Sequence, residues 1–341
     1  MAKKKTVKKS KVKSKNKRKK KGGNSLLDLI IAEFIIGAVV LISKFNGGPA
    51  VKYIKSDKLA EWGDTGDKKG QMNSPRGVAV SPDGQFVYVS VLNNSAVYKY
   101  KQDGTFVSGS AGKGNKPGEF NEPSGISTDK DGNLYVADAW NGRIQKFDSK
   151  GKFLLEIGGV KGGFYSPRNV SVNKYGVVFV GDTGTSRIHR FDSEGNRMGN
   201  PVGGAGTSLG KFGEVFGIAF DSKGRVYAAD AGNRRIEVFS SDLVPQSQVK
   251  VKAWKTSFPL WPMLAVDSRD RLYAVSSGTQ EIIVFDTTGK KLKQIGVIKN
   301  DMREKPLFSN PLGIAIDQQD NLYITEITRN KVLKIKPLFE Q

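Results

Sequence analysis

The sequence predicts an all-β fold, a six-bladed β-propeller with four-stranded blades, because one unit of about 47 residues returns six times. Equivalent positions lie 44 to 49 residues apart and are Gly77, Gly125, Asn169, Gly217, Leu264 and Gly313. Turns such as Asp83-Gly84 and Asp131-Gly132 divide each unit into short apolar strands. Glycine accepts the positive φ that tight hairpins require. Units of antiparallel strands repeated radially form propeller blades.

Large apolar residues mark the second and third strands of each unit. The second strand carries an aromatic residue near its centre, at Tyr88, Tyr135, Phe179, Tyr227, Tyr273 and Tyr323. The third strand ends on Tyr100, Phe147, Phe191, Phe239, Phe285 or Ile335. A further turn then leads into a fourth strand in most units. The Gly-rich stretches between units precede no helix, so we interpret them as crossings between blades and not as phosphate-binding loops.

The sixth unit lacks its own fourth strand, because the chain ends soon after Ile335. The segment KLAEWGD, residues 58–64, parallels the fourth strand FLLEIGG, residues 153–159. We therefore expect residues 58–63 to pair with the strand near 330–337 and close the ring. Closure in this way removes both sheet edges and so prevents edge-to-edge aggregation.

The first 56 residues differ from the rest, and we divide the chain into four parts. Residues 1–24 form a Lys-rich tail, expected to be disordered and cytoplasmic because like charges repel and little apolar surface is present. Residues 25–45 are mostly apolar and long enough for a transmembrane helix, about 30 Å. Residues 46–56 are a linker, and residues 57–341 form the propeller.

A single-pass anchor with the N-terminus in the cytoplasm would place the propeller on the extracytoplasmic side, since positive flanks set orientation. Asp28 and Glu33 weaken this interpretation, because a carboxylate inside a membrane helix is costly. A cleaved signal peptide and an amphipathic or soluble helix remain alternatives. The basic tail could contact anionic lipid headgroups or RNA.

Composition excludes several classes of site. The chain has no Cys, so it has no disulfide, Cys-ligated zinc or thiol nucleophile. His189 is the single His, whereas zinc-dependent lyase chemistry would need several imidazole ligands. More than half of the net charge of +22 lies near the N-terminus, because residues 1–23 hold 13 of the 55 Lys and Arg and no Asp or Glu.

The motif P-x-G-[IV]-[AS], then D-x-x-G-x-[LV]-Y-V-A-D, then N-x-R-[IV]-x-x-F resembles the NHL-repeat family of β-propellers. Residues 123–147 meet it almost fully, and residues 218–239 meet it well. The resemblance covers about residues 57–341 and implies the propeller fold. It also implies several functions: docking of proteins or peptides, RNA binding, and metal-dependent lyase or lactonase chemistry in related six-bladed forms. Fold alone does not choose among them.

Three Asp residues recur five positions before an Arg residue, as Asp138 with Arg143, Asp182 with Arg187, and Asp230 with Arg235. One interpretation is an ion pair inside each blade. The other is an acidic ring that holds a cation such as Ca²⁺ through oxygen ligands. No other Glu, Asn and Asp constellation stands out as a metal site.

Aromatic and Arg side chains are expected in the loops of one face, a mixture typical of binding hot spots. These candidate binding residues are Arg76, Trp140, Arg168, Phe216 and Trp261. Phe216 and Trp261, with Met263, could instead fill the spaces between blades. The sequence supports three hypotheses: a non-catalytic scaffold for a protein, peptide or glycan ligand; an RNA-binding propeller if the helix does not insert; and a metal-dependent lactonase-like or lyase-like enzyme.

Overall fold

The computed structural model describes residues 58–341, apart from 111, 160–162, 255–260, 297–306 and 340–341. The predicted tail, helix and linker at 1–24, 25–45 and 46–56 lie outside the described residues. In the part of the chain that is described, no helix combines the length and the hydropathy needed to cross a membrane.

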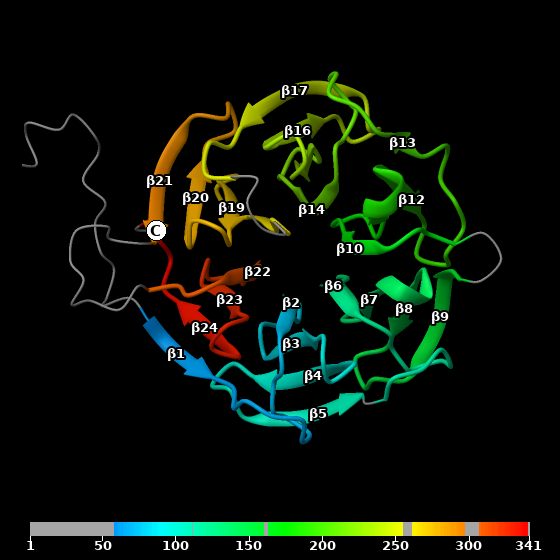
Figure 1. Cartoon of the computed structure of the whole chain (residues 1–341), viewed down its shortest axis with the longest axis vertical. Coiled ribbons are helices and arrows are strands. Elements are labelled where there is room, and N and C mark those ends of the chain that lie inside the picture. Colours follow the sequence, from blue (N-terminus) through cyan, green and yellow to red (C-terminus); the bar gives the residue numbers. More distant parts are fainter. Residues whose placement is uncertain (1–57, 111, 160–162, 255–260, 297–306, 340–341) are drawn as a thin grey trace, which may run out of the picture. The chain divides into compact units, whose positions relative to one another are not determined.

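Six four-stranded antiparallel sheets surround a central axis, so the predicted all-β six-bladed propeller is confirmed (Figure 1). Within blades 1 to 5 the chain runs from an inner strand beside the axis to an outer strand at the rim. Blades are numbered 1 to 6 in the order of their inner strands.

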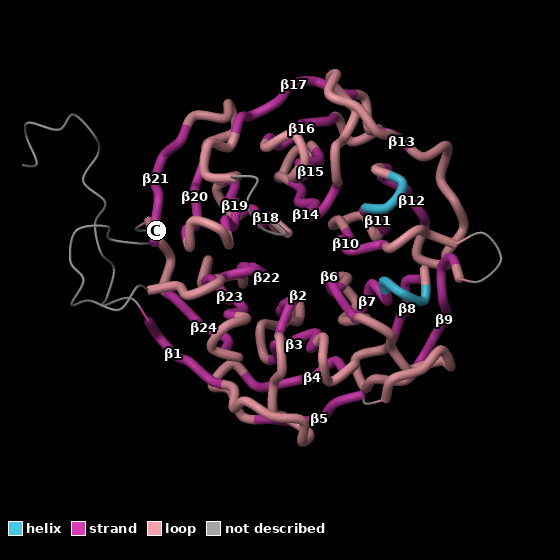
Figure 2. Tube along the Cα trace, in the orientation of Figure 1, coloured by secondary structure: helices cyan, strands magenta, loops and turns pink. Residues whose placement is uncertain are grey.

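Blades 1 to 3 follow in chain order. Blade 1 contains β2 (Pro75–Val80), β3 (Phe86–Val91), β4 (Ala96–Lys101) and β5 (Phe106–Ser110). Blade 2 contains β6 (Pro123–Thr128), β7 (Leu134–Asp138), β8 (Arg143–Phe147) and β9 (Phe153–Gly158). Blade 3 contains β10 (Pro167–Val172), β11 (Val178–Asp182), β12 (Arg187–Phe191) and β13 (Val202–Gly203). Two short 3-10 helices, η2 (Ala139–Asn141) and η3 (Thr183–Thr185), join the second and third strands of blades 2 and 3 (Figure 2).

Blades 4 to 6 complete the ring. Blade 4 contains β14 (Val215–Phe220), β15 (Val226–Asp230), β16 (Arg235–Phe239) and β17 (Pro245–Lys250). Blade 5 contains β18 (Leu264–Val266), β19 (Leu272–Ser276), β20 (Glu281–Phe285) and β21 (Lys291–Gly296). Blade 6 contains β22 (Pro311–Ile316), β23 (Leu322–Glu326), β24 (Lys331–Ile335) and, as its outer strand, β1 (Lys58–Trp62).

The N-terminal strand closes the ring as predicted. Strand β1 pairs antiparallel with β24, with Lys58 opposite Ile335 and Trp62 opposite Val332. A side chain of blade 6 continues the contact into blade 1, because Asn330 Oδ1 accepts a hydrogen bond of 2.8 Å from the backbone N–H of Ser74. The two ends of the propeller are therefore held by backbone pairing as well as by packing.

The repeated inner-strand glycines are required by close approach of neighbouring blades. A Cβ on Gly217 would lie 2.6 Å from the backbone nitrogen of Leu264 in the next blade. A Cβ on Gly313 would lie 2.2 Å from the backbone oxygen of Arg76. These distances are below van der Waals contact, so larger residues at these positions would push adjacent inner strands apart.

We predict that Gly217→Val lowers the free energy of unfolding by about 3 kcal/mol or more, since the new side chain overpacks against backbone that cannot rotate away. Equilibrium denaturation in urea measures the loss. Leu264→Val is the matched control, because blade 5 already accommodates a side chain at the same repeat position, and it should cost about 1 kcal/mol. Equal losses in the two variants would contradict the explanation.

One large apolar residue from each crossing between blades is buried beneath the crossing. These residues are Met72, Phe120, Phe164, Phe212, Trp254 and Phe308. The interpretation of the Gly-rich stretches as crossings is confirmed, because Phe120 and Phe212 lie at their ends and lead directly into inner strands. The apolar clusters join side chains of neighbouring blades, as where Met263 and Ile314 share one cluster. Each blade therefore depends on its neighbours for its core.

One face of the ring carries both the crossings and the loops between second and third strands. Backbone hydrogen bonds join the two kinds of loop, such as Ala139 N–H to Glu122 O at 3.2 Å and Ala231 N–H to Glu214 O at 2.9 Å. We call this the top face. Its loops are tied to the inner strands, so side chains there are held in fixed positions.

Candidate functional site

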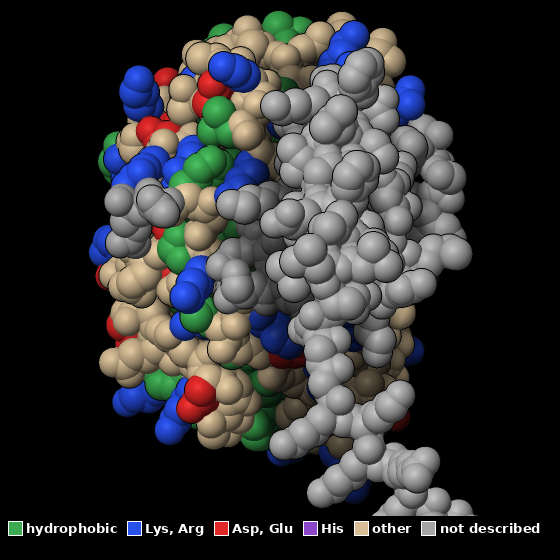
Figure 3. Space-filling model, turned by 90° about the vertical axis from the view of Figure 1, so that its left-hand side faces the viewer, with side chains coloured by type: hydrophobic (Ala, Val, Ile, Leu, Met, Phe, Trp, Pro, Cys, Tyr) green, Lys and Arg blue, Asp and Glu red, His purple; other side chains and the backbone are tan. Residues whose placement is uncertain are grey.

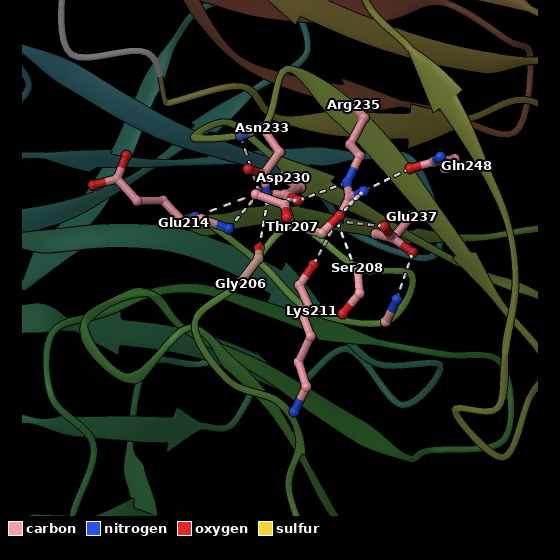
Figure 4. A network of polar contacts seen from close by, with 12 residues as sticks. Gly206, Thr207, Ser208, Lys211, Glu214, Asp230, Asn233, Arg235, Glu237 and Gln248 are labelled. Atoms are coloured by element: carbon pink, nitrogen blue, oxygen red, sulfur yellow. Dashed lines mark hydrogen bonds and ion pairs between the residues drawn. The ribbon is translucent and has the colours of Figure 1, made fainter.

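The Asp and Arg pairs of blades 2 and 4 are internal braces. Arg143 Nε donates to Asp138 Oδ2 at 2.8 Å, and Arg235 Nε donates to Asp230 Oδ2 at 2.9 Å. Both carboxylates are completely buried. Asp230 also accepts hydrogen bonds from the Gly213 backbone and the Asn233 side chain (Figure 4).

The guanidinium groups extend each brace to the crossing that precedes the blade. Arg235 donates to the backbone oxygens of Ser208 and Lys211 (Figure 4). In blade 2, Arg143 donates to those of Lys116 and Glu119. The oxygens of Asp138 and Asp230 are thus engaged by N–H donors of their own blades. Among the described residues, no group of three His, Cys, Asp or Glu is placed to hold a metal ion. These contacts favour the ion-pair interpretation over an acidic ring for Ca²⁺.

Blade 3 departs from the expected pairing. In the described part of the chain, Arg187 makes no ion pair with Asp182 and its side chain is exposed. Asp182 instead accepts a hydrogen bond of 2.6 Å from Thr185 Oγ1, and His189 Nε2 lies 3.6 Å from its Oδ2. Eight residues separate Gly158 from Pro167, against twelve between β5 and β6. The crossing before blade 3 is therefore four residues shorter than the crossing before blade 2.

His189 is buried inside blade 3. Its ring lies 5.1 Å from that of Phe164, and Arg197 Nη1 lies 2.8 Å from its Nδ1. An Arg side chain donates and does not accept hydrogen bonds, so this contact assigns the acceptor role to Nδ1. Because these neighbours belong to its own blade and crossing, the position of His189 supports a structural role.

Glu326 occupies in blade 6 the place that Asp138 and Asp230 hold in blades 2 and 4. Its Oε2 accepts hydrogen bonds from the backbone of Ser309 and Asn310, while its Oε1 is buried without a partner among the described residues. Burial raises the pKa of Glu326 above its ordinary value. The neutral carboxylic acid is therefore favoured by the fold relative to the carboxylate.

We predict that Glu326→Gln raises the free energy of unfolding near pH 7 by about 1 kcal/mol, because it removes a buried charge while keeping the shape. The folded-state pKa is raised, so the ionised wild type loses stability as pH rises through and above the ordinary Glu pKa. The advantage of the variant should disappear below about pH 4, where wild-type Glu326 is protonated in both states. Thermal melts between pH 3 and pH 8 test this, and a pH-independent difference would contradict it.

The centre of the top face brings together predicted binding residues from different blades. Arg76 follows Pro75 at the start of β2, Arg168 follows Pro167 at the start of β10, and Trp261 precedes β18. The guanidinium carbon of Arg76 lies 3.8 Å from the centre of the Trp261 ring, and that of Arg168 lies 5.2 Å from it. A guanidinium over an indole face is a cation–π contact.

Glu122, which was not among the predicted binding residues, completes this cluster from blade 2. Its Oε1 lies 2.9 Å from Arg76 Nη1 and 2.8 Å from Arg168 Nη1. We call Arg76, Glu122, Arg168 and Trp261 the central cluster. One feature of the sequence could have indicated this residue. Glu122 lies directly before Pro123 in blade 2, and the blades on either side carry Arg76 and Arg168 directly after the corresponding Pro.

The central cluster stands at one end of a channel along the axis. The channel has a cavity of about 200 Å³ between the inner strands and includes Gly77, Asn169 and Met263 in its lining. Asn169 Nδ2 lies 3.7 Å from Met263 Sδ across the channel. Arg76 and Arg168 directly precede the lining residues Gly77 and Asn169, so the cluster lies at the channel mouth.

The other two predicted binding residues lie apart from the central cluster. Phe216 is 2% exposed and packs in the core between blades 4 and 5, which agrees with a space-filling role. Trp140 in η2 is 70% exposed on the top face. It borders a groove of about 870 Å³ whose lining includes Asn115, Asn141 and Glu156. Trp140 therefore supplies an accessible aromatic surface beside amide and carboxylate groups.

Comparison with known proteins identifies one repeat at the sequence level. The family model described as NHL repeat matches residues 120–147, which lie in and just before blade 2. This match agrees with the resemblance noted in the sequence. No curated protein matches the chain significantly.

Solved structures share the fold with this chain at low sequence identity. A catalytically inactive virginiamycin B lyase from Staphylococcus aureus, crystallised with quinupristin, matches with a TM-score of 0.56 and 14% identity over 81% of this chain and 82% of that chain. A gluconolactonase from Xanthomonas campestris matches with a TM-score of 0.57 and 17% identity over 84% and 98%. A nidogen/laminin complex matches with a TM-score of 0.51 and 16% identity over 64% and 79%. At these identities the likeness concerns the fold alone.

Proposed function

We propose that this chain is a membrane-anchored, non-catalytic binding scaffold whose propeller presents a protein, peptide or glycan site on its top face. The central cluster carries the proposal, because four side chains from four blades converge at the channel mouth. Arg and Trp are enriched at binding hot spots, and here both are held by rigid strand ends. The exposed Trp140 beside the groove adds a second contact area on the same face.

A binding array tests the proposed function. Labelled full-length protein is applied to arrays of peptides and glycans, and affinities of the selected ligands are measured in solution. Trp140→Ala should weaken binding about tenfold or more, since it removes an exposed aromatic anchor. Tyr175→Ala is the matched control, because Tyr175 is equally exposed but lies in the turn between β10 and β11. Equal weakening in both variants, or no array ligand at all, would contradict the proposal.

Membrane anchoring through residues 25–45 is part of the proposal and rests on the apolar sequence of that segment. Protease treatment of intact cells that express tagged protein tests it. We expect cleavage of a C-terminal tag and protection of an N-terminal tag. The opposite pattern would reject an extracytoplasmic propeller. Contact of the Lys-rich tail with anionic lipid or RNA belongs to the same geometry and would be reduced by salt.

A metal-dependent lactonase-like or lyase-like activity is the second candidate, favoured by the two enzymes with a similar fold. Metal analysis of the purified protein, combined with melting in the presence and absence of a chelator, tests this candidate. A stoichiometric metal whose removal lowers the melting temperature would favour an enzyme over a scaffold.

RNA binding is a third candidate and has less support from the surface. In the part of the view in Figure 3 that the grey residues leave uncovered, Lys and Arg lie interspersed with Asp and Glu. An RNA-binding propeller should lose affinity steeply as salt rises. Crosslinking to RNA through Arg76 and Arg168, together with such a salt response, would replace the scaffold proposal.

A further inference from the structure

The central cluster holds more positive than negative charge. Two guanidinium groups, from Arg76 and Arg168, share the single carboxylate of Glu122. Both contacts go to the same oxygen, Oε1, so one carboxylate oxygen serves two cations. The cluster has a net charge of about +1 in a partly desolvated site, where an unbalanced charge is costly.

Arg76 shows this imbalance most clearly. Its side chain is 4% exposed, and in the described part of the protein neither Nε nor Nη1 has a hydrogen-bond partner. The Nη1 contact with Glu122 satisfies distance but not hydrogen-bond geometry. Burial lowers the pKa of Arg76 to about 10; the Glu122 carboxylate opposes this effect, while the Arg168 guanidinium adds to it. A buried cation with unfilled donors is a place where a second anion would be stabilised.

Arg168 provides the accessible side of the cluster. Its side chain is 18% exposed, and its Nη1 donates a hydrogen bond to Glu122. A guanidinium has five N–H donors, and among the described residues the Arg168 guanidinium donates to Glu122, which leaves donors for another partner. An anion bound there would lie beside Trp261 and close enough to Arg76 to balance its charge.

We propose that the central cluster binds the carboxylate group of the ligand that occupies the top face, with Arg168 as the direct donor and Arg76 as the buried counter-charge. This inference rests on the proposed function and adds the chemistry of the ligand. A carboxylate carries one negative charge and balances the excess, whereas a phosphate dianion would leave the site negative. The flat carboxylate also matches the forked guanidinium donors.

Titration of the full-length protein with N-acetylglycine, and with its neutral amide as the matched isostere, tests the inference. Calorimetry gives the affinity, and the Arg Nε–Hε signals in NMR spectra report the site. The acid should bind at least tenfold more tightly than the amide and shift the Arg168 signal. A methyl glucuronide and its methyl ester form a second arm, which distinguishes a sugar acid from a peptide carboxylate as the source.

Three variants separate binding from folding. Arg168→Gln should weaken binding of the acid at least tenfold, and Arg168→Lys should retain part of it. Arg187→Gln removes the same charge from an exposed residue of the same blade and should change affinity less than twofold. Glu122→Gln should strengthen binding of the acid about tenfold, because it removes the competing carboxylate.

Equal binding of acid and amide, tighter binding of inorganic phosphate than of the acid, or weaker binding of the acid by folded Glu122→Gln would overturn the inference. These outcomes are distinguishable from failure of the proposed function. Array ligands that bind through Trp140 without any carboxylate preference would leave the scaffold intact and remove the anion site. If the acid binds but no array ligand is found, the anion site is supported and the scaffold proposal fails.

Discussion

Deletion of residues 58–64 from the chain is expected to lower the melting temperature by roughly 10 °C or more and to promote association. The deletion removes β1, which supplies the outer strand of blade 6. It also removes Trp62, a buried residue whose ring lies 6.3 Å from Tyr100 and 6.4 Å from Tyr323. Loss of a buried Trp alone costs about 3 to 5 kcal/mol. The exposed edge of β24 would then be free to pair with another molecule.

Deletion of residues 1–57 is the control for this experiment, because it leaves β1 in place. We expect that deletion to retain the melting temperature of the parent propeller within about 2 °C and to leave its association state unchanged. Calorimetry and light scattering measure the two effects. If both deletions melt alike, ring closure by β1 contributes nothing to stability and the assignment of its role is wrong.

Asp230→Ala is expected to lower the free energy of unfolding by about 3 to 5 kcal/mol, the second large effect. The substitution removes the carboxylate that Arg235 Nε bonds, leaves Glu237 Oε1 at 2.9 Å as its other buried carboxylate partner, and frees the Gly213 N–H and the Asn233 amide. Breaking a buried pair by removal of one member costs more than the pair itself contributes.

Asp182→Ala is the matched comparison in blade 3. Asp182 has no guanidinium partner among the described residues, and its Oδ1 is buried without a hydrogen bond. Its removal should cost about 1 to 2 kcal/mol, mainly through the lost contact with Thr185. Chemical denaturation of both variants gives the difference. Similar losses would mean that the Arg235 brace does not distinguish blade 4 from blade 3.

The fold was largely predictable from the sequence because its determinants repeat. Glycines at 77, 125, 217 and 313 recur where inner strands meet, and the spacing of their recurrence predicts the number of blades. Closure was predictable for a related reason: the last unit lacks a strand, and the segment at 58–64 supplies the missing pattern. Local features that recur six times can be aligned with one another, which makes their interpretation dependable.

The candidate site was less predictable because each of its residues recurs in few blades: Arg occupies one repeat position in blades 1 and 3, as Arg76 and Arg168. Glu122 occurs at a loop position where blade 4 carries Glu214 and blades 1 and 3 carry Ser74 and Ser166, so comparison of the repeats did not single it out. Its partnership with Arg76 and Arg168 depends on three blades meeting at the axis. Arg187 shows the opposite problem. Its motif is regular, but Asp182 contacts Thr185 and His189, and the Arg187 side chain is exposed.

Two of the candidate binding residues that the sequence placed in one group differ in their exposure to solvent. Phe216 and Trp261 both precede or begin inner strands and share one apolar cluster, yet Phe216 is buried, whereas Trp261 is partly buried and also lies against two guanidinium groups. The residues that adjacent blades contribute determine this difference in burial and contacts, and the spacing of residues in the sequence does not predict them.

Hydrogen exchange of the full-length protein, with and without a ligand selected from the arrays, tests the top-face site most directly. We predict slower exchange on binding at residues 74–77, 121–125, 139–142 and 166–169, which include the central cluster and η2. Exchange in the turns at 129–133 and 221–225 should stay unchanged, because these turns join first and second strands and lie outside the top-face loops. Protection confined to those turns, with none at the channel mouth, would contradict the account.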